Sequence, residues 1–193
     1  MSPAPPTSQN AAWRGGVRRI GIFGGSFNPV HRGHLALASY AVSELNLDKV
    51  FFVPAHQNPL KKMEVRHAAL LPSSLRMSLL RKAIRGTPKF SVSDIELKRK
   101  GISYTVDTLR FFNRKFGKKT QLFFLAGADQ LKNFSRWKSP EEVLKLCRFV
   151  VATRPGSRLS TGDKRILRMP MPPIDISSSD IRKKLNSPRP LFK

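Results

Sequence analysis

Apolar runs recur along the chain and predict a series of buried strands. The runs are rich in β-branched and aromatic residues and are bounded by Gly, Pro or polar residues. One segment, Phe90–Leu97, alternates between apolar and polar residues with a slip in phase and is also interpreted as a strand. The predicted strands are Arg18–Phe23, Lys49–Val53, Phe90–Leu97, Gln121–Ala126 and Arg148–Thr153, with a short further candidate at Ile174–Ser177.

Between these strands, apolar residues recur at the spacing of an amphipathic helix. Residues 101–105 are expected to form a turn, and residues 58–71 and 158–173 lack both patterns and are expected to be irregular. The predicted helices run from about His34 to Leu45, from Pro72 to near Gly86 with Leu75, Leu79, Leu80 and Ile84 on one face, from Val106 to Phe116, and over Pro140–Leu146, and a last one begins at Ser178 or Ser179.

Strands and helices alternate along the sequence, which predicts an α/β protein with a doubly wound parallel sheet. Ligands of such sheets bind beyond the carboxyl ends of the strands. The segments that follow Phe23, Val53 and Ala126 are therefore the first places to look for chemistry.

Length and composition limit the organisation of the chain. Its 193 residues suit one domain. We expect residues 18–193 to form that domain and residues 1–17 to be a disordered or loosely ordered tail, because the first ten residues are rich in Pro and Ser and lack the apolar core of a secretory signal. No run is long and apolar enough to span a bilayer. The single Cys147 excludes an intramolecular disulfide and fits a reducing, cytoplasmic location.

The formal net charge of +24 is extreme and favours anionic partners. Lys and Arg neutralise phosphates, so nucleic-acid binding is one interpretation. Affinity for small anionic substrates and a basic surface without a specific partner are two others. The positive residues are spread along the chain without one dense arm, and no zinc spacing, RNA-stacking motif or basic heptad helix occurs, so no specific nucleic-acid partner is expected.

Candidate chemistry concentrates in the stretch Gly21–Leu35. An apolar strand leads into Gly-Gly-Ser at residues 24–26, where backbone N–H groups can approach a ligand closely, and His31 and His34 then lead into a helix. A strand, a glycine turn and a helix start form an anion site, because free N–H groups and the positive end of the helix dipole point to the same place. Two imidazoles beside it are donors for a phosphate whose charge rises in a transition state.

Residues 24–35, Gly-Gly-Ser-Phe-Asn-Pro-Val-His-Arg-Gly-His-Leu, resemble a motif of the HxGH nucleotidylyltransferase superfamily, in the form found in bacterial nicotinate-nucleotide adenylyltransferases. Further matches follow in the family's order: Glu-Leu-Lys-Arg and Ser-Tyr-Thr within 96–109, Gly-x-Asp and Phe-x-x-Trp within 127–137, Arg-Pro-Gly at 154–156, and Ile-Ser-Ser-Ser-Asp-Ile-Arg at 176–182. The resemblance implies a Rossmann-like fold and transfer of the adenylyl group of ATP to nicotinate mononucleotide, giving deamido-NAD and pyrophosphate in NAD biosynthesis.

The same resemblance implies roles for individual residues. His31 and His34 would be the catalytic pair, with His34 nearest the α-phosphate, and Mg²⁺ would be bound through the phosphates of ATP and by no protein metal site. The implied ATP-binding residues are Gly24, Gly25, Ser26, His31, His34, Ser178 and Arg182. The implied mononucleotide-binding residues are Ser26, Lys61, Tyr104, Thr105, Asp129 and Trp137, of which Trp137 would stack on the pyridine ring.

Three positions depart from the family's pattern. Leu60 stands where members often have a phosphate-binding histidine, and Lys138 stands where many have an aromatic residue after the tryptophan. The sequence also stops at Lys193, where the family usually continues into a further helix. These departures concern the mononucleotide pocket and the packing of the carboxyl-terminal region.

Two alternatives of different kinds stay open at this point. One is another HxGH nucleotidylyltransferase, with nicotinamide mononucleotide or a phosphopantetheine compound as the acceptor. The other is a basic nucleic-acid-binding protein. The residues by themselves leave open the choice between acid and amide mononucleotides, the oligomeric state and the role of the positive charge.

Overall fold

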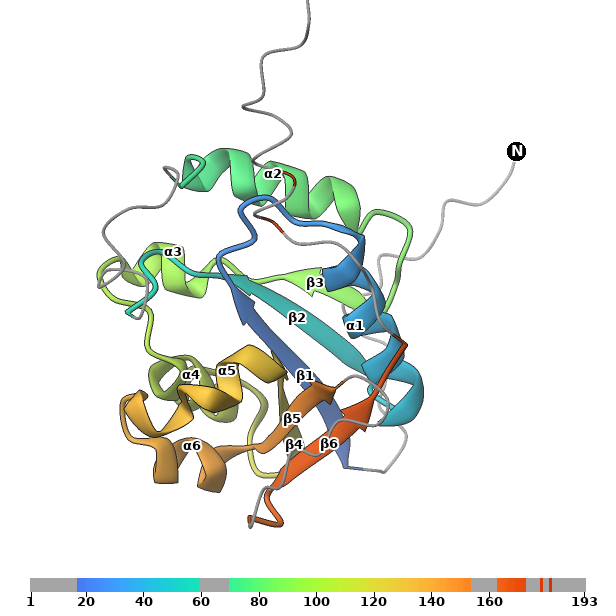
Figure 1. Cartoon of the computed structure of the whole chain (residues 1–193), viewed down its shortest axis with the longest axis vertical. Coiled ribbons are helices and arrows are strands. Elements are labelled where there is room, and N and C mark those ends of the chain that lie inside the picture. Colours follow the sequence, from blue (N-terminus) through green and yellow to red (C-terminus); the bar gives the residue numbers. More distant parts are fainter. Residues whose placement is uncertain (1–16, 60–69, 154–162, 173–177, 179–180, 182–193) are drawn as a thin grey trace, which may run out of the picture.

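The computed structural model describes residues 17–59, 70–153, 163–172, 178 and 181. At its centre lies a sheet in the order β3-β2-β1-β4-β5-β6, in which every neighbouring pair is parallel (Figure 1). The strands are β1 (Arg18–Gly25), β2 (Lys49–Pro54), β3 (Phe90–Val92), β4 (Thr120–Gly127), β5 (Arg148–Thr153) and β6 (Ile166–Pro170). The predicted doubly wound sheet is confirmed, and the strand order reverses direction between β1 and β4.

The helices that connect these strands are α1 (Arg32–Glu44), α2 (Ser73–Ala83), α3 (Ile95–Arg99), α4 (Thr105–Phe116), α5 (Ala128–Lys132), the 3₁₀ turn η2 (Phe134–Arg136) and α6 (Pro140–Leu146). The predicted helices at 34–45, 72–86, 106–116 and 140–146 are all present, and three short elements, α3, α5 and η2, were not predicted. Ser178 and Ile181 are also helical. None of the helices in the described part of the chain has the length and apolar character needed to cross a membrane.

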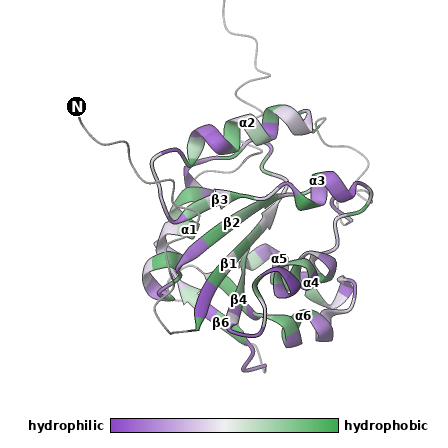
Figure 2. Cartoon of the chain, turned by 180° about the vertical axis from the view of Figure 1, so that it is seen from behind, coloured by the Kyte–Doolittle hydropathy of each residue, from purple (hydrophilic) through white to green (hydrophobic). Residues whose placement is uncertain are grey.

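The sheet is covered on both faces, which agrees with the apolar central residues of its inner strands (Figure 2). On one face, Phe52 and Phe23 of the sheet pack in one cluster with Leu80 of α2 and residues of α1. On the other face, Phe149 packs with Leu109 of α4 and residues of α6. Complete burial of each such side chain contributes about 1.5–3 kcal/mol to folding. The two apolar layers therefore fix the sheet and the loops at its carboxyl edge.

The predicted strand Phe90–Leu97 is wrong in its second half. Pairing with β2 ends at Phe52 and Val92, and the chain then enters the short helix α3. Asp94 begins this helix, with its backbone carbonyl accepting a bond from the N–H of Lys98 at 2.9 Å and its carboxylate 3.2 Å from the Lys98 ammonium. The slip in the alternation marked a real change of structure rather than an irregular strand.

Strand β6 was not predicted, because residues 158–173 are basic and rich in proline. Its residues pair in parallel with β5, from Ile166 beside Phe149 to Pro170 beside Thr153. An edge strand tolerates proline and exposed charged residues, since one of its sides has no ladder to maintain. This segment forms a strand because it lies beside β5, and the local sequence pattern does not contain that information.

The inner face of α2 also differs from the prediction. Leu75 is 43% exposed, whereas Arg76 is only 1% exposed, and Met77 and Leu80 are buried with it. A charged residue therefore occupies the place expected for an apolar one. The predicted strand at residues 174–177 lies outside the described residues.

Candidate active site

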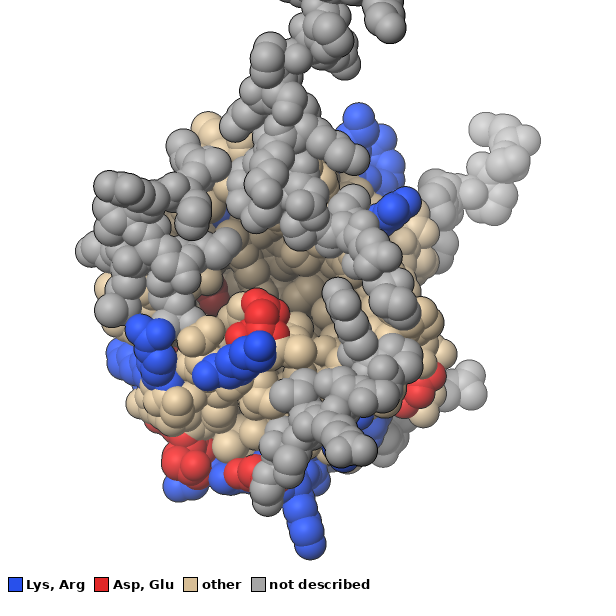
Figure 3. Space-filling view, viewed as in Figure 1, with Lys and Arg blue, Asp and Glu red and all other residues tan. Residues whose placement is uncertain are grey.

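A cavity of about 620 Å³ opens at the carboxyl edge of the sheet, where β1 and β4 lie side by side. This is the point at which the strand order reverses, and ligands of doubly wound sheets bind there. Figure 3 shows the molecule hollowed at this place. The volume lies within the range of small-molecule sites. The cavity contains the predicted site residues Gly24, Gly25, Ser26, His31, His34, Tyr104, Thr105, Asp129, Trp137 and Ser178.

Residues 24–26, here called the cradle, form the floor of the cavity. The two glycines are the last residues of β1, paired with Val53 and Pro54 of β2, and the chain turns only at Asn28 and Pro29. The turn predicted at residues 24–26 is therefore wrong in position, because the two glycines end β1 and the turn follows at residues 28 and 29. A Cβ on Gly24 would lie 3.4 Å from the Phe124 ring and one on Gly25 3.3 Å from the Phe27 ring, so glycine at these positions lets the two rings pack closely against the backbone.

Arg76 connects α2 to the cradle from inside the protein. Its Nη1 donates to the carbonyl oxygens of Ser26 at 2.8 Å and Ala55 at 2.9 Å. Its Nε donates to the Leu71 carbonyl at 3.1 Å and its Nη2 to the Ser73 hydroxyl at 3.0 Å. Burial lowers the pKa of this guanidinium, but arginine still carries its charge at neutral pH. Arg76 therefore fixes the ends of β1 and β2 together and adds a positive charge behind the cradle.

His31 and His34 lie at the start of α1, and their rings stack with centroids 3.7 Å apart. His34 also packs against Phe27 and Phe23, with ring centroids 5.0 and 5.9 Å away. Both histidines line the cavity together with the cradle. The two rings therefore lie in the same cavity as the glycines, as the sequence led us to expect.

The hydrogen bonds of the two histidines set their donor directions. The backbone N–H of His31 donates to Nδ1 of His34 at 3.2 Å, so Nδ1 is the acceptor and the proton of the neutral ring is on Nε2. Burial and the neighbouring His31 lower the pKa of His34 to about 3, and burial lowers the pKa of His31. Nδ1 of His31 is buried and has no hydrogen-bond partner among the described residues. A ligand that accepts or donates a hydrogen bond would satisfy this atom.

Aromatic and polar side chains line another part of the cavity. Tyr104 and Thr105 come from the start of α4, and Trp137 follows η2 and packs against Phe124 with ring centroids 5.7 Å apart. Asp129 lies in the first turn of α5, and one of its carboxylate oxygens accepts from Gln130 Nε2 at 2.6 Å. Flat aromatic surfaces beside polar groups suit a heterocyclic base.

Ser178 joins the carboxyl-terminal part of the chain to this site. Its hydroxyl donates to the carbonyl oxygen of Pro29 at 3.0 Å, next to the cradle, although the two residues are far apart in sequence. Two predicted site residues, Lys61 and Arg182, lie outside the described residues. Their predicted roles stay predictions.

Sequence reasoning missed the buried polar residues that support the site. Glu96 lines the cavity, and its carboxylate accepts from Thr108 Oγ1 at 2.6 Å. Burial raises the pKa of the Glu96 carboxyl, while hydrogen bonds from Thr108 and Ser103 oppose the shift. The Ser103 hydroxyl also accepts from the backbone N–H of His56 at 2.9 Å. These residues stood in a matched motif, but only the fold shows that they hold the segment before Tyr104.

The arrangement suits charge stabilisation at a phosphate rather than attack by a side chain. The two imidazoles, the cradle and the starts of α1 and α4 line one cavity, and such groups act by offsetting charge. No group of three or more His, Cys, Asp or Glu residues in the described ranges could hold a metal ion. A divalent cation here would have to be held largely by the oxygens of its substrate.

Comparisons with known proteins agree with this arrangement. The sequence model of the family described as cytidylyltransferase-like matches residues 22–184. A protein of Thermoanaerobacter sp. (strain X514) named probable nicotinate-nucleotide adenylyltransferase is 40% identical over 188 residues, which cover 90% of this chain and 85% of that relative. A protein of the same name from Clostridium novyi (strain NT) is 40% identical over 182 residues, which cover 89% and 88% of the two chains.

Solved structures show the same architecture. The nicotinic acid mononucleotide adenylyltransferase of Plasmodium falciparum complexed with APC matches with a TM-score of 0.71 and 19% identity, over 90% of this chain and 87% of that one. At this level of identity the likeness concerns the fold, and it supports the doubly wound sheet described above.

Proposed function

Because the chain belongs to the nicotinate-nucleotide adenylyltransferases of the cytidylyltransferase-like family, we propose that it transfers the adenylyl group of ATP to nicotinate mononucleotide. A phosphate oxygen of the mononucleotide attacks the α-phosphorus of ATP, and the bond from that phosphorus to the bridging oxygen of the β-phosphate breaks. The products are deamido-NAD and pyrophosphate, so the protein acts in NAD biosynthesis. The observation that carries this proposal is the pair of stacked, oriented imidazoles beside the cradle.

His34 offers its Nε2–H to an oxygen of the α-phosphate. Its Nδ1 is engaged by the backbone of His31, so the ring is held in one tautomer and one orientation before substrate binds. Because burial and His31 lower the pKa of His34 to about 3, the ring is neutral at physiological pH and donates a hydrogen bond through Nε2. His31, which lines the same cavity, contacts the phosphates next to it. No side chain has to act as a nucleophile, since positioning and charge stabilisation carry nucleotidyl transfer.

The cradle and Ser178 contact the phosphates of ATP from two sides. Backbone N–H groups of residues 24–26 and the start of α1 favour negative charge. The roles of Lys61 toward the mononucleotide phosphate and of Arg182 toward the β- and γ-phosphates belong to this proposal too. Mg²⁺ completes the site when bound through the ATP phosphates, where it neutralises the leaving pyrophosphate.

Nicotinate mononucleotide occupies the part of the cavity lined by Tyr104, Thr105, Asp129 and Trp137. An aromatic face suits the positively charged pyridinium ring of this substrate. The single, buried Cys147 agrees with action in a reducing cytoplasm.

A pyrophosphate-release assay with ATP, Mg²⁺ and either mononucleotide tests the proposal. Release is expected with nicotinate mononucleotide and is expected to stop when a chelator removes the cation. His34→Ala should lower turnover about 10²–10³-fold, the usual cost of removing one transition-state donor. His56→Ala is the matched control, because His56 is a part-exposed histidine outside the cavity wall whose Nδ1 contacts the Gly101 carbonyl. Silence with both mononucleotides, or full turnover in His34→Ala, would refute the proposal.

A further inference from the structure

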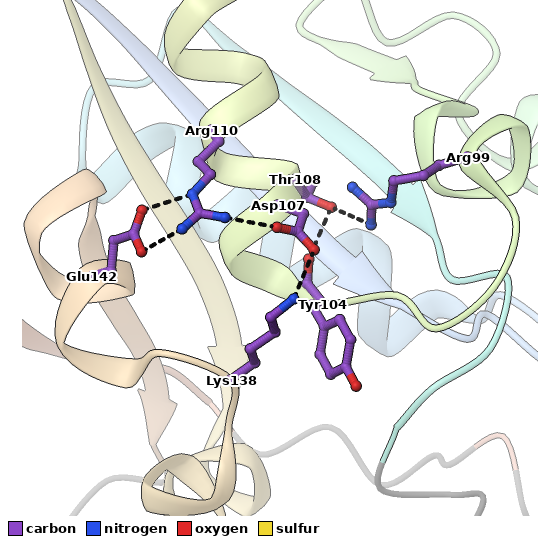
Figure 4. Close-up of polar contacts among 7 residues, drawn as sticks. All are labelled: Arg99, Tyr104, Asp107, Thr108, Arg110, Lys138 and Glu142. Carbon is purple, nitrogen blue, oxygen red and sulfur yellow. Dashed lines mark hydrogen bonds and ion pairs between the residues drawn. The ribbon is translucent and has the colours of Figure 1, made fainter.

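Lys138 places a fixed positive charge on the wall of the cavity. It directly follows Trp137 and lines the cavity together with Trp137 and Tyr104. Its Nζ lies 4.5 Å from the centroid of the Tyr104 ring and 3.7 Å from Oδ2 of Asp107 (Figure 4). The side chain is 48% exposed, so it reaches the ring and the carboxylate from the solvent side of the wall.

A chain of ion pairs holds Lys138 in this place. The other carboxylate oxygen of Asp107 accepts from Arg110 Nη1 at 3.0 Å. Arg110 makes a two-pronged contact with Glu142 of α6, with distances of 2.7 Å from Nε and 2.6 Å from Nη2. Glu142 raises the pKa of Arg110, and Arg110 lowers the pKa of Glu142, so both stay charged. Networks with bidentate geometry order their side chains better than isolated surface pairs do, and this one connects α4 and α6 to the cavity wall.

The two possible acceptors differ in charge near this cation. The base of nicotinate mononucleotide combines a pyridinium ring with a carboxylate, so its net charge is zero. The base of nicotinamide mononucleotide has the same ring with a neutral amide, so its net charge is +1. A lysine beside the ring repels the amide base, whereas the carboxylate of the acid base offsets that repulsion.

The carboxylates in the cavity act in the opposite direction. Asp129 and Glu96 both line it, and a negative charge favours a cationic base. Burial raises the pKa of Glu96, and its carboxylate is already engaged by the Thr108 hydroxyl. Arg136 and Lys138 are the cations of the lining on either side of Trp137, and Lys138 has its charge 4.5 Å from the centroid of the Tyr104 ring.

We propose that Lys138, fixed by Asp107, is a specificity-determining residue that makes the site prefer nicotinate mononucleotide to nicotinamide mononucleotide. The inference rests on the proposed function, because it requires the base to lie between Tyr104 and Trp137. It assigns a function to one of the positions at which this sequence departs from the family's pattern.

The experiment compares kcat/KM for the two mononucleotides with saturating ATP at low ionic strength. Lys138→Met, which keeps the length and removes the charge, should lower the acid-to-amide ratio about five- to tenfold, the effect of one charge a few ångströms away at a partly exposed site. Lys138→Arg should keep the wild-type ratio.

Two controls separate this effect from a change in net charge or in folding. Lys132→Met removes an equal charge from the end of α5, outside the cavity wall, and should leave the ratio unchanged. Added salt should reduce the ratio of the wild-type enzyme and have little effect on Lys138→Met, because screening acts on the charge that the variant lacks.

The outcomes distinguish this inference from the proposed function. A wild-type enzyme active on the acid, with the ratio unchanged in Lys138→Met, overturns the inference and leaves the function in place. A shift of equal size in Lys132→Met also overturns it, since the effect would then come from overall charge. A wild-type protein inactive with both mononucleotides overturns the function and the inference together.

Discussion

Replacing Arg76 with methionine would remove the guanidinium that joins the cradle to α2. The side chain is 1% exposed, and it donates to the carbonyl oxygens of Ser26, Ala55 and Leu71 and to the hydroxyl of Ser73. Methionine has an unbranched side chain that fills part of the same interior space, but it offers no hydrogen-bond donor. Three backbone carbonyls would then lose the partner that the fold provides.

The expected loss of stability follows from these contacts. A buried acceptor left without a donor costs about 1–3 kcal/mol. The removed charge partly compensates, because burial disfavours the charged guanidinium, as its lowered pKa shows. We therefore expect the free energy of unfolding to fall by about 3 kcal/mol. For a chain of this size, that corresponds to a melting temperature lower by roughly 6–12 °C.

Urea denaturation, followed by circular dichroism, measures this loss, and steady-state assays on the same variant measure KM for ATP. KM should rise, because the backbone carbonyl of Ser26 loses the guanidinium that holds it. Arg81→Met is the matched control, since Arg81 lies on the same helix and is exposed. A loss below about 1 kcal/mol, within the range of ordinary surface substitutions, would refute the role given to Arg76.

Three further predictions follow from the site. His34 has a pKa of about 3 when folded and 6.5 when unfolded, so its contribution to stability is complete above pH 6.5 and is lost as the pH falls toward 3. In His34→Asn, the free energy of unfolding should fall less steeply with pH over this range than in the wild type. Equal slopes for the two proteins would contradict the lowered pKa. Gly21→Ala should lower the free energy of unfolding by about 1–3 kcal/mol through overpacking, because its Cβ would lie 2.9 Å from a core side chain. Gly24→Ala should lower turnover more than it lowers the melting temperature. A Gly24→Ala variant with normal turnover and a lowered melting temperature would contradict the role of the cradle. Thr108→Val removes the donor at 2.6 Å from the Glu96 carboxylate and should cost about 1–3 kcal/mol in thermal or urea unfolding, and an unchanged stability would show that water replaces the hydroxyl.

The strands, most helices and the position of the cavity could be predicted from the sequence, because they depend on local patterns. Gln121–Ala126 and Pro140–Leu146 have the periods of a strand and a helix, and β4 extends the first range by one residue at each end while α6 matches the second. The motif from β1 to α1 places its two histidines at the correct edge of a parallel sheet. The local sequence pattern was sufficient to predict an element wherever the packing of the fold agreed with that pattern.

The parts that could not be predicted depend on distant neighbours. Arg76 lies among apolar positions of α2, and nothing in the sequence of that helix indicates that three carbonyls from other elements surround it. β6 forms because β5 offers a free edge. The tautomer of His34 depends on one backbone N–H, and the place of Lys138 depends on a carboxylate of α4. Each of these contacts needs the completed fold.

The hydrogen bond from Ser178 to Pro29 has a consequence for synthesis on the ribosome. The chain emerges from its amino terminus, so β1 and the two histidines leave the exit tunnel long before Ser178 does. Until then the carbonyl of Pro29 lacks this donor, and one wall of the nucleotide cavity is missing. A nascent chain that has not yet exposed this serine therefore holds an incomplete site, and catalytic competence is acquired only after Ser178 has left the tunnel.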